Sequence, residues 1–172
     1  MTYVRFLDSP LGKIGLASDG TYLTGLWFEG QTRDAENVEG PVEERNCPVF
    51  ETTVKWLQTY FEGTIPLVAP ELRMKVTPFR KAVYEALLTV PYGQTVSYGQ
   101  IARLLKQSGK YAFASARAVG NAVAHNPILL IVPCHRVIGA DGSMIGFAGG
   151  IERKRKLLQI ERDYFKKFQN CC

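Results

Sequence analysis

The sequence predicts an α+β protein of two domains: an N-terminal β-meander with a helix at residues 1–75, and a mainly helical domain with a helix-turn-helix at 76–172. Short apolar runs separated by turn residues open the chain, whereas helical periodicity dominates after Val76. The charge divides at the same point, since residues 1–75 hold 7 Lys and Arg against 11 Asp and Glu, and residues 76–172 hold 14 against 5. A basic half beside an acidic half indicates a module that binds a polyanion, although solubilising surface charge would give the same totals.

Three short strands are predicted in the first domain, at 3–7, 13–17 and 22–28. The turn sequences SPLG and SDG separate them, as in a β-meander. Residues 31–46 are polar, acidic and without period, which predicts a loop. A helix is predicted next, because four apolar residues recur at helical spacing before Gly63: Phe50, Val54, Leu57 and Phe61. The proline-containing stretch 64–76 is expected to connect the two domains.

Helices are also predicted at the start and the end of the second domain. Thr77 followed by Pro78 is typical of a helix start, and apolar residues at helical spacing then give that helix a buried face: Phe79, Val83 and Leu87. A basic amphipathic helix is expected at about 151–162. Between these helices, the apolar run 128–132 predicts a buried strand, and the Asp-Gly pair at 141–142 favours a hairpin turn.

Two short helices in the middle of this domain form a candidate helix-turn-helix. Ser97 and Gln100 make a capping box for the first helix, which is expected to run to about Leu105. The second helix is expected at about 114–124, after a loop that contains Gly109. Helices arranged in this way commonly bind DNA, so the polyanion indicated by the charge is expected to be DNA.

The second helix of this motif carries unusually small side chains. Its alanines and Gly120 leave one face almost bare, which lets the backbone approach a narrow groove closely. Arg117 and Asn121, on one side of the helix, are the chief groups that can reach bases, too few for a typical reader of the major groove. The pattern favours weakly sequence-selective binding in the minor groove, with one long cation entering the base stack. Close packing between helices, which also uses Ala and Gly, is the alternative.

The composition is that of a globular protein, with 46% hydrophobic and 22% charged residues. The longest apolar run, 128–132, is too short to span a bilayer, and the N-terminus lacks the features of a secretion signal. We therefore expect no membrane association and a cytoplasmic location, or a nuclear one in a eukaryote. The chain has 4 cysteines without a Cys-x-x-Cys pair and only 2 histidines, so no metal and no cofactor are expected. No role follows for Cys47, and the pair Cys171–Cys172 is expected to be a frayed end.

The most reactive group is expected to be the thiol of Cys134. The stretch ILLIVPCHRVIG at 128–139 places Cys134 beside His135, directly after Pro133. Neighbouring side chains of an extended chain point to opposite faces, so the imidazole is expected to act on the thiol through a water after a bend at Pro133. Activation matters because a thiol at its ordinary pKa is only a few per cent thiolate at neutral pH.

Glu161 is the carboxylate best placed to orient the imidazole of His135. It lies among Leu157, Leu158 and Ile160 on the final helix, so it is expected to face inward, where a buried acid needs a partner. Each of the three residues also has an ordinary structural role open to it: Cys134 as a small buried hydrophobe, His135 as a core histidine and Glu161 as a surface helix partner. Their occurrence together after a candidate helix-turn-helix favours the catalytic interpretation.

Several motifs, in the same order, resemble those of the O6-alkylguanine-DNA alkyltransferases, which repair DNA by direct reversal of damage. PCHRV stands intact at 133–137, and similar motifs cover essentially the whole chain: WLQTYFEG at 56–63, PYGQTVSYGQIA at 91–102, ARAVG at 116–120, NP at 126–127 and GFAGG at 146–150. The resemblance implies a ribonuclease-H-like N-terminal domain and single-turnover transfer of the alkyl group of O6-alkylguanine, less so of O4-alkylthymine, to Cys134. It also implies a monomer that binds the minor groove of double-stranded DNA with the alkylated guanine flipped out.

The resemblance further implies a role for each site residue. Cys134 would accept the alkyl group, activated through a water by His135, which Glu161 would orient. Tyr98 would help to rotate the nucleotide out of the duplex and would donate a proton or hydrogen bond to the leaving guanine. Arg117 would fill the vacated space in the stack, and Asn126 would brace the turn between the DNA-binding helices and the active site. The base pocket would be lined by Val123, Val137, Phe147, Ala148 and Gly149.

Phe147 and Ala148 depart from the pattern of the family, some members of which carry Tyr and Ser there. The missing side-chain hydroxyl bears on how bulky adducts and inhibitors are handled, and leaves the nucleophile in place. Three other functions are open from the sequence: a damage-recognition protein without chemistry, a helix-turn-helix regulator and a cysteine hydrolase. The presence of Cys134 argues against the first, the bare helix against the second, and the adjacency of Cys134 and His135 against the third.

Overall fold

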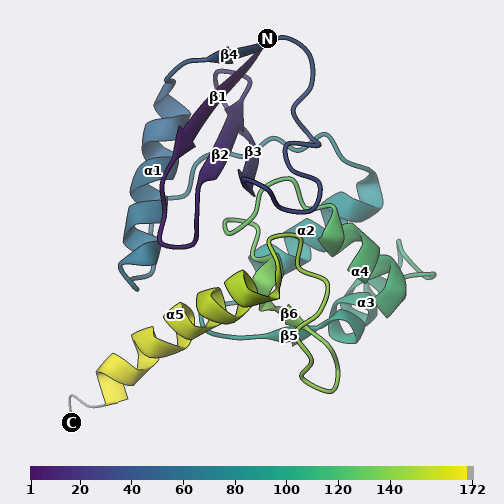
Figure 1. The fold of residues 1–172 in the computed structure, drawn as a ribbon. Coiled ribbons are helices and arrows are strands. Elements are labelled where there is room, and N and C mark those ends of the chain that lie inside the picture. Colours follow the sequence, from purple (N-terminus) through teal and green to yellow (C-terminus); the bar gives the residue numbers. More distant parts are fainter. Residues whose placement is uncertain (170–172) are drawn as a thin grey trace.

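The first half of the chain forms a four-stranded sheet with one helix packed against it (Figure 1). This computed structural model describes residues 1–169. The predicted meander is present as three antiparallel strands, and a fourth pairs in parallel with the first, in the order β3-β2-β1-β4: β1 (Thr2–Leu7), β2 (Ile14–Ser18), β3 (Leu23–Phe28) and β4 (Val42–Glu44). The helix α1 (Pro48–Phe61) packs on β2 and β3 and buries Phe50 and Leu57, as their spacing predicts.

The loop predicted at 31–46 is wrong in its last part, because β4 lies within it. Val42, Glu43 and Glu44 are all exposed, so no alternation of polar and apolar residues marks this strand. Backbone pairing with β1 holds it, in a register that places Thr2 opposite Val42. An edge strand of this kind depends on its hydrogen bonds, which leave no pattern in the sequence.

The connection between the two halves is tied to the sheet. The backbone N–H of Leu23 donates to the carbonyl of Glu71 at 2.9 Å, and the N–H of Arg73 donates to the carbonyl of Leu23 at 3.0 Å. The stretch 64–76 contains no helix, and its Leu72 forms an isolated parallel bridge with Leu23, the first residue of β3.

The second half consists mainly of four helices: α2 (Pro78–Leu88), α3 (Tyr98–Gln107), α4 (Ala116–Ala124) and α5 (Ile151–Gln169). The predicted caps are present, since the hydroxyl of Thr77 accepts from the N–H of Arg80, and Ser97 forms the capping box with Gln100. α3 and α4 pack on each other and on α2 as a helix-turn-helix (Figure 1). A short parallel pair, β5 (Val96–Ser97) with β6 (Val137–Ile138), ties the start of α3 to the segment that follows Cys134.

The helix α5 extends beyond the predicted end at Arg162 and projects from the body of the protein (Figure 1). Its additional residues are held by aromatic contacts, with the ring of Tyr164 at 5.6 Å and that of Phe165 at 6.5 Å from the ring of Tyr92. The pair Cys171–Cys172 lies outside the described residues.

The strand predicted at 128–132 is wrong. This segment forms turns, with one isolated bridge from Ile128 to Leu26 of β3, and Leu130 adopts a left-handed φ of 68°. All five residues are buried, and burial on every side makes an irregular segment indistinguishable from a buried strand in the sequence.

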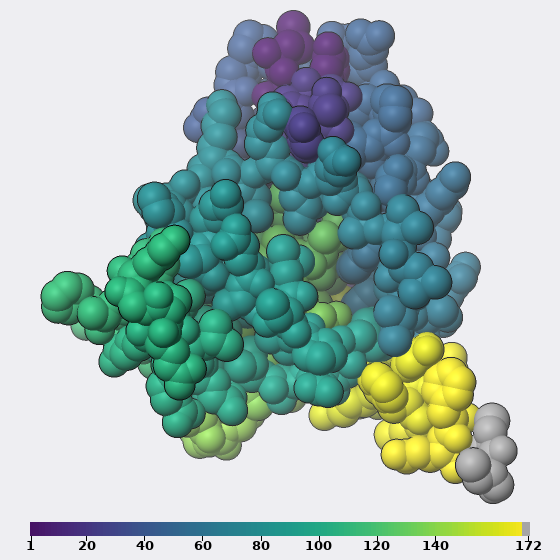
Figure 2. Space-filling view, turned by 180° about the vertical axis from the view of Figure 1, so that it is seen from behind, coloured from purple at the N-terminus to yellow at the C-terminus, as the bar shows by residue number. Residues whose placement is uncertain are grey.

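One hydrophobic core runs through both halves and reaches the residues around Cys134. It includes Phe28 and Tyr60 from the first half and Val83 and Leu157 from the second. Figure 2 shows the two halves in continuous contact, with the end of α5 standing apart. Among residues 1–169, no helix has the length and apolar character that crossing a membrane requires.

Candidate active site

Cys134 begins a single 3-10 turn, η1 (Cys134–Arg136), rather than continuing an extended chain. The bend expected at Pro133 is present, and successive side chains of the 3-10 turn that follows point about 120° apart. The turn is closed by the N–H of Arg136, which donates to the carbonyl of Pro133 at 3.0 Å. Cys134 is 1% exposed and His135 is fully buried, so both groups meet in a site shielded from bulk water.

Asn126 fixes the position of the thiol. Its Nδ2 donates to the carbonyl of Val132 at 2.9 Å and to Sγ of Cys134 at 3.1 Å, while its Oδ1 accepts from the N–H of Ile128 at 3.0 Å. The amide group of Asn126 therefore bonds backbone groups of the segment between α4 and the thiol, as a neighbouring strand would in a sheet. This bracing also explains why the apolar run 128–132 folds as a turn.

Glu161 accepts hydrogen bonds from four different residues in the core. Its Oε1 lies 2.7 Å from Nε2 of His135 and accepts from the hydroxyl of Tyr60 at 2.9 Å. Arg136 donates from Nη2 to Oε1 and from Nε to Oε2, both at 3.0 Å, and the N–H of Gly93 donates to Oε2 at 3.0 Å. Glu161 is fully buried, as its place among apolar residues predicts. The sequence did not indicate Tyr60, Gly93 or Arg136 as its partners.

These contacts set the protonation states of Glu161 and His135. Burial alone would raise the pKa of Glu161, but the hydrogen bonds from His135 and Arg136 and the positive charge of Arg136 outweigh it and lower that pKa to about 2. An ionised carboxylate only accepts, so Nε2 of His135 carries the hydrogen that faces it. Burial lowers the pKa of His135, which keeps the ring neutral at neutral pH and leaves Nδ1 with a free lone pair. Nδ1 is buried without a protein partner among residues 1–169.

Lys154 on α5 brings a buried cation near the thiol, although it was not among the predicted site residues. Its side chain is fully buried, and Nζ donates to the carbonyls of Val137 and Ile145. Burial lowers the pKa of Lys154 to about 8, against the opposing effect of the nearby Cys134. Burial raises the pKa of the Cys134 thiol to about 11, while the hydrogen bond from Asn126 and the charge of Lys154 act in the opposite direction. Lys154 lies three and seven residues before Leu157 and Glu161, so helical spacing places it on their face.

Tyr98 is hydrogen-bonded to the segment 145–149, whose Phe147 lies against His135. Tyr98 is the first residue of α3, and its hydroxyl donates to the carbonyl of Ile145 at 2.7 Å. Phe147 is buried, with its ring centroid 6.4 Å from that of His135. Of the other predicted pocket residues, Val123, Val137 and Gly149 are buried and Ala148 is partly exposed. The hydrogen bond between Tyr98 and Ile145 joins the start of α3 to this segment.

Two of the three predicted DNA contacts, Arg117 and Asn121, lie on the surface of α4, and the third, Tyr98, begins α3. Arg117 and Asn121 are exposed, and Ala116 beside them is exposed as well, so the helix presents a flat surface with one long cation. No Asp or Glu occurs between Glu85 and Asp141 in the sequence. A helix-turn-helix without a carboxylate suits a phosphate backbone.

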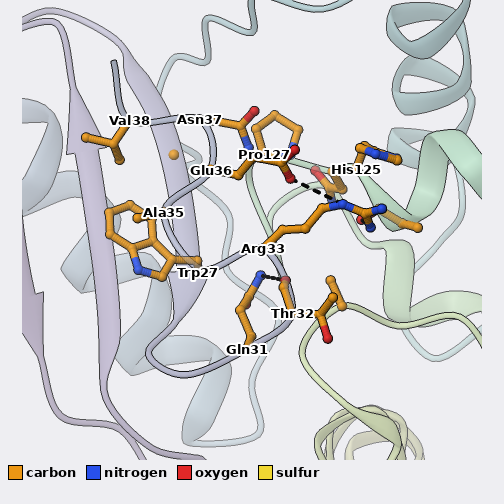
Figure 3. A pocket seen from close by; sticks show the side chains of 14 residues that line it. Trp27, Gln31, Thr32, Arg33, Ala35, Glu36, Asn37, Val38, His125 and Pro127 are labelled. Atoms are coloured by element: carbon orange, nitrogen blue, oxygen red, sulfur yellow. Dashed lines mark hydrogen bonds and ion pairs between the residues drawn. The ribbon is translucent and has the colours of Figure 1, made fainter. Parts of the chain in front are cut away.

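A narrow hollow of about 10 Å³ lies where the loop 31–38 of the first half meets the end of α4 (Figure 3). Nη1 of Arg33 donates to the carbonyl of Ala124, the last residue of α4, at 3.2 Å. Asn126 and Ala148 also line this hollow, whereas Cys134 does not. The N-terminal half therefore touches the segment that holds the thiol. Among residues 1–169, no group of three or more His, Cys, Asp or Glu is placed to hold a metal ion.

Comparisons with known proteins point to the same family for both halves of the chain. The family profile described as "6-O-methylguanine DNA methyltransferase, ribonuclease-like domain" matches residues 2–67, and "6-O-methylguanine DNA methyltransferase, DNA binding domain" matches residues 78–163. A "Methylated-DNA--protein-cysteine methyltransferase" of Mycobacterium tuberculosis (strain ATCC 25618 / H37Rv) is 43% identical over 94% of this chain and 93% of its own length. One of Methanosarcina mazei is 37% identical over 95% of this chain and 99% of its own length.

A solved structure has the same fold. The crystal structure of Mycobacterium tuberculosis OGT in complex with DNA superposes with a TM-score of 0.81 at 44% identity, covering 94% of each chain. The two family profiles together match residues 2–67 and 78–163, so both halves of the fold belong to the same family. The chain therefore belongs to the 6-O-methylguanine DNA methyltransferase family.

Proposed function

We propose that this protein repairs DNA by transferring the alkyl group of O6-alkylguanine, and less readily of O4-alkylthymine, to its own Cys134 in a single turnover. The observation that carries the proposal is a pair of buried contacts at adjacent residues, from Asn126 to Cys134 and from His135 to Glu161. It combines a nucleophile, a neutral base and an anchored carboxylate in one core. The relatives named as methylated-DNA–protein-cysteine methyltransferases support the same reaction.

In the proposed reaction, Nδ1 of His135 takes the thiol proton, directly or through a water, and the sulfur attacks the alkyl carbon. A new S–C bond forms while the C–O bond to guanine breaks, and guanine leaves with the electron pair of that bond. Glu161 stabilises the imidazolium that results, as its low pKa allows. The ammonium of Lys154 and the amide of Asn126 stabilise the developing thiolate. The product is a thioether with no easily hydrolysed bond, so each molecule reacts once.

Access for the base requires the segment 145–149 to move. Cys134 is 1% exposed, and the hydroxyl of Tyr98 is engaged with the carbonyl of Ile145. When a flipped base displaces this segment, the hydroxyl is freed to donate a hydrogen bond or proton to the departing guanine. Val123, Val137, Phe147, Ala148 and Gly149 would line the space occupied by the base.

DNA binding is supported by the match to a DNA-binding domain and by the DNA complex of the similar Mycobacterium structure. We propose that a monomer binds the minor groove through α4, with Arg117 filling the space of the flipped nucleotide and Asn121 beside it. We also propose a division into domains after Lys75, which falls between the two family matches. The substrate is genomic DNA, so we place the protein in the cytoplasm, or in the nucleus of a eukaryote.

The proposal is tested by transfer of labelled methyl groups from O6-methylguanine in duplex DNA. We expect label on the protein in wild type and none in Cys134→Ala, with circular dichroism showing that the variant is folded. A binder without chemistry would hold the methylated duplex and gain no label. A folded Cys134→Ala variant that keeps full transfer would refute the assignment of the nucleophile.

A further inference from the structure

The turn between α3 and α4 is longer than a helix-turn-helix requires. Eight residues, 108–115, separate Gln107 from Ala116, whereas about three or four commonly join such helices. The turn stands out as a knob beyond α3 and α4, at the right of Figure 1 and at the left edge of Figure 2. Phe113 within it is 97% exposed, more than any other large hydrophobic side chain among residues 1–169. The ring of Phe113 is therefore fully available to a partner that binds at this turn.

The turn is anchored on both sides of Phe113. The ring of Tyr111 packs edge-on against Phe79 with centroids 5.5 Å apart, and its hydroxyl donates to the carbonyl of Pro78 at 3.1 Å. Ala114 is 3% exposed, and its N–H donates to the carbonyl of Tyr111 at 3.0 Å. Ser115 then caps α4. Phe113 therefore points outward from an anchored part of the turn, just before the start of α4.

The surroundings of Phe113 suit a nucleic acid. Its exposed neighbours Ala112, Ser115 and Ala116 are small, so the ring rises above a flat surface that continues to Arg117. The exposed charged groups of α3, the turn and α4 are all cationic: Arg103, Lys106, Lys110 and Arg117. An exposed ring among cations, without a carboxylate on the motif, is complementary to a DNA surface of phosphates with apolar sugar and base edges between them.

We propose that Phe113 is a second DNA contact of this protein, lying against the sugar and base edges of the minor groove beside the nucleotide that Arg117 replaces. The inference rests on the proposed function and extends it, because it gives the elongated turn a part in holding the duplex. The ring contributes apolar contact and Lys110 contributes charge. Phe113 does not touch the thiol, so its effect is confined to substrates that carry a duplex.

The test compares Phe113→Ala with Leu67→Ala, which removes another exposed apolar side chain, 92% exposed, from the connection outside the helix-turn-helix. Binding to methylated duplex is measured by fluorescence anisotropy, and transfer is measured with the duplex and with free O6-methylguanine. We expect Phe113→Ala to bind the duplex about tenfold more weakly, the lower range for loss of one aromatic contact with a base. Its reaction with the free base should equal that of wild type, and Leu67→Ala should match wild type in every assay.

Two further measurements separate the contribution of the ring from that of charge. Phe113→Trp, which keeps an aromatic ring at this position, should bind the duplex as tightly as wild type. The dependence of log Kd on log salt should keep its slope in Phe113→Ala and become shallower by about one in Lys110→Ala, because only a cation releases counterions.

A duplex affinity of Phe113→Ala within twofold of wild type would overturn the inference. So would a wild-type dimer in sedimentation velocity that Phe113→Ala dissociates without a change in DNA affinity, since the ring would then serve a protein contact. If wild type transferred no methyl group from either substrate, the proposed function would fail, and the duplex affinities would still decide the role of Phe113.

Discussion

Replacing Glu161 with Gln removes one negative charge from a core that is built around it. The carboxylate accepts from His135, Tyr60, Arg136 and Gly93. An amide has one acceptor atom and one NH₂ group. If its oxygen takes the place of Oε1, its NH₂ group faces the N–H of Gly93 and Nε of Arg136, which are both donors. The variant therefore leaves buried donors unsatisfied and a guanidinium without its counter-ion.

The magnitude follows from the pKa of Glu161. A value of about 2 against the ordinary 4.5 corresponds to about 3 kcal/mol of stabilisation, at about 1.4 kcal/mol per pH unit. Because the carboxyl binds its proton more weakly in the folded chain, this contribution is complete above pH 4.5 and is lost as the pH falls from 4.5 towards 2. The guanidinium of Arg136, left without its counter-ion, adds to the loss. We therefore expect Glu161→Gln to lower the free energy of unfolding at pH 7 by about 3–5 kcal/mol.

Urea denaturation at pH 7, 5 and 3 measures this difference. We expect the gap between wild type and Glu161→Gln to shrink at pH 3, because the carboxyl of the unfolded chain is then protonated while that of the folded chain stays mostly ionised. Glu152→Gln is the matched control on the same helix, because Glu152 pairs with Arg155 at 2.9 Å on the exposed surface and should change stability by less than about 1 kcal/mol. A loss below 1 kcal/mol for Glu161→Gln at pH 7, or an equal loss for Glu152→Gln, would refute this reasoning.

Lys154→Met should slow methyl transfer at least about tenfold, because it removes the positive charge that opposes the high pKa of Cys134. Single-turnover kinetics at pH 7 measure this rate, and an unchanged rate would exclude the electrostatic role of Lys154. Arg117→Ala should slow repair of duplex DNA more than reaction with free O6-methylguanine, and equal losses on both would mean that the side chain has no part in base extrusion. Tyr98→Phe frees the carbonyl of Ile145, so chymotryptic cleavage after Phe147 should become faster while duplex transfer slows. An unchanged cleavage rate would show that this hydrogen bond does not restrain the segment.

Patterns that depend on burial of one face were readable in the sequence. The helix at 48–61 and the inward position of Glu161 follow from the spacing of apolar residues, and the start of α3 follows from Ser97 and Gln100. The residues that form each of these patterns lie within a few helical turns of one another in the sequence, so the pattern can be seen without the fold. The family motifs added the order of the site residues along the chain.

The features that the sequence did not reveal depend on contacts between distant segments. The exposed strand β4 is held by backbone pairing to β1, and the turn at 128–132 is set by the amide of Asn126. Lys154 was missed because a lysine is assumed to be exposed, although its spacing from Glu161 placed it on the buried face. Glu161 lies on α5, and its partners come from α1, the segment around Gly93 and η1, a convergence that only the tertiary fold produces.

The most direct test of this account is the mass of the intact protein after incubation with an excess of duplex DNA that contains O6-methylguanine. We predict that each molecule gains the mass of one methyl group, that peptide analysis places it on Cys134, and that demethylated DNA never exceeds one equivalent per protein. Product in excess of the protein, or a methyl group found on another residue while Cys134 stays unmodified, would contradict the claim that this buried sulfur is the acceptor.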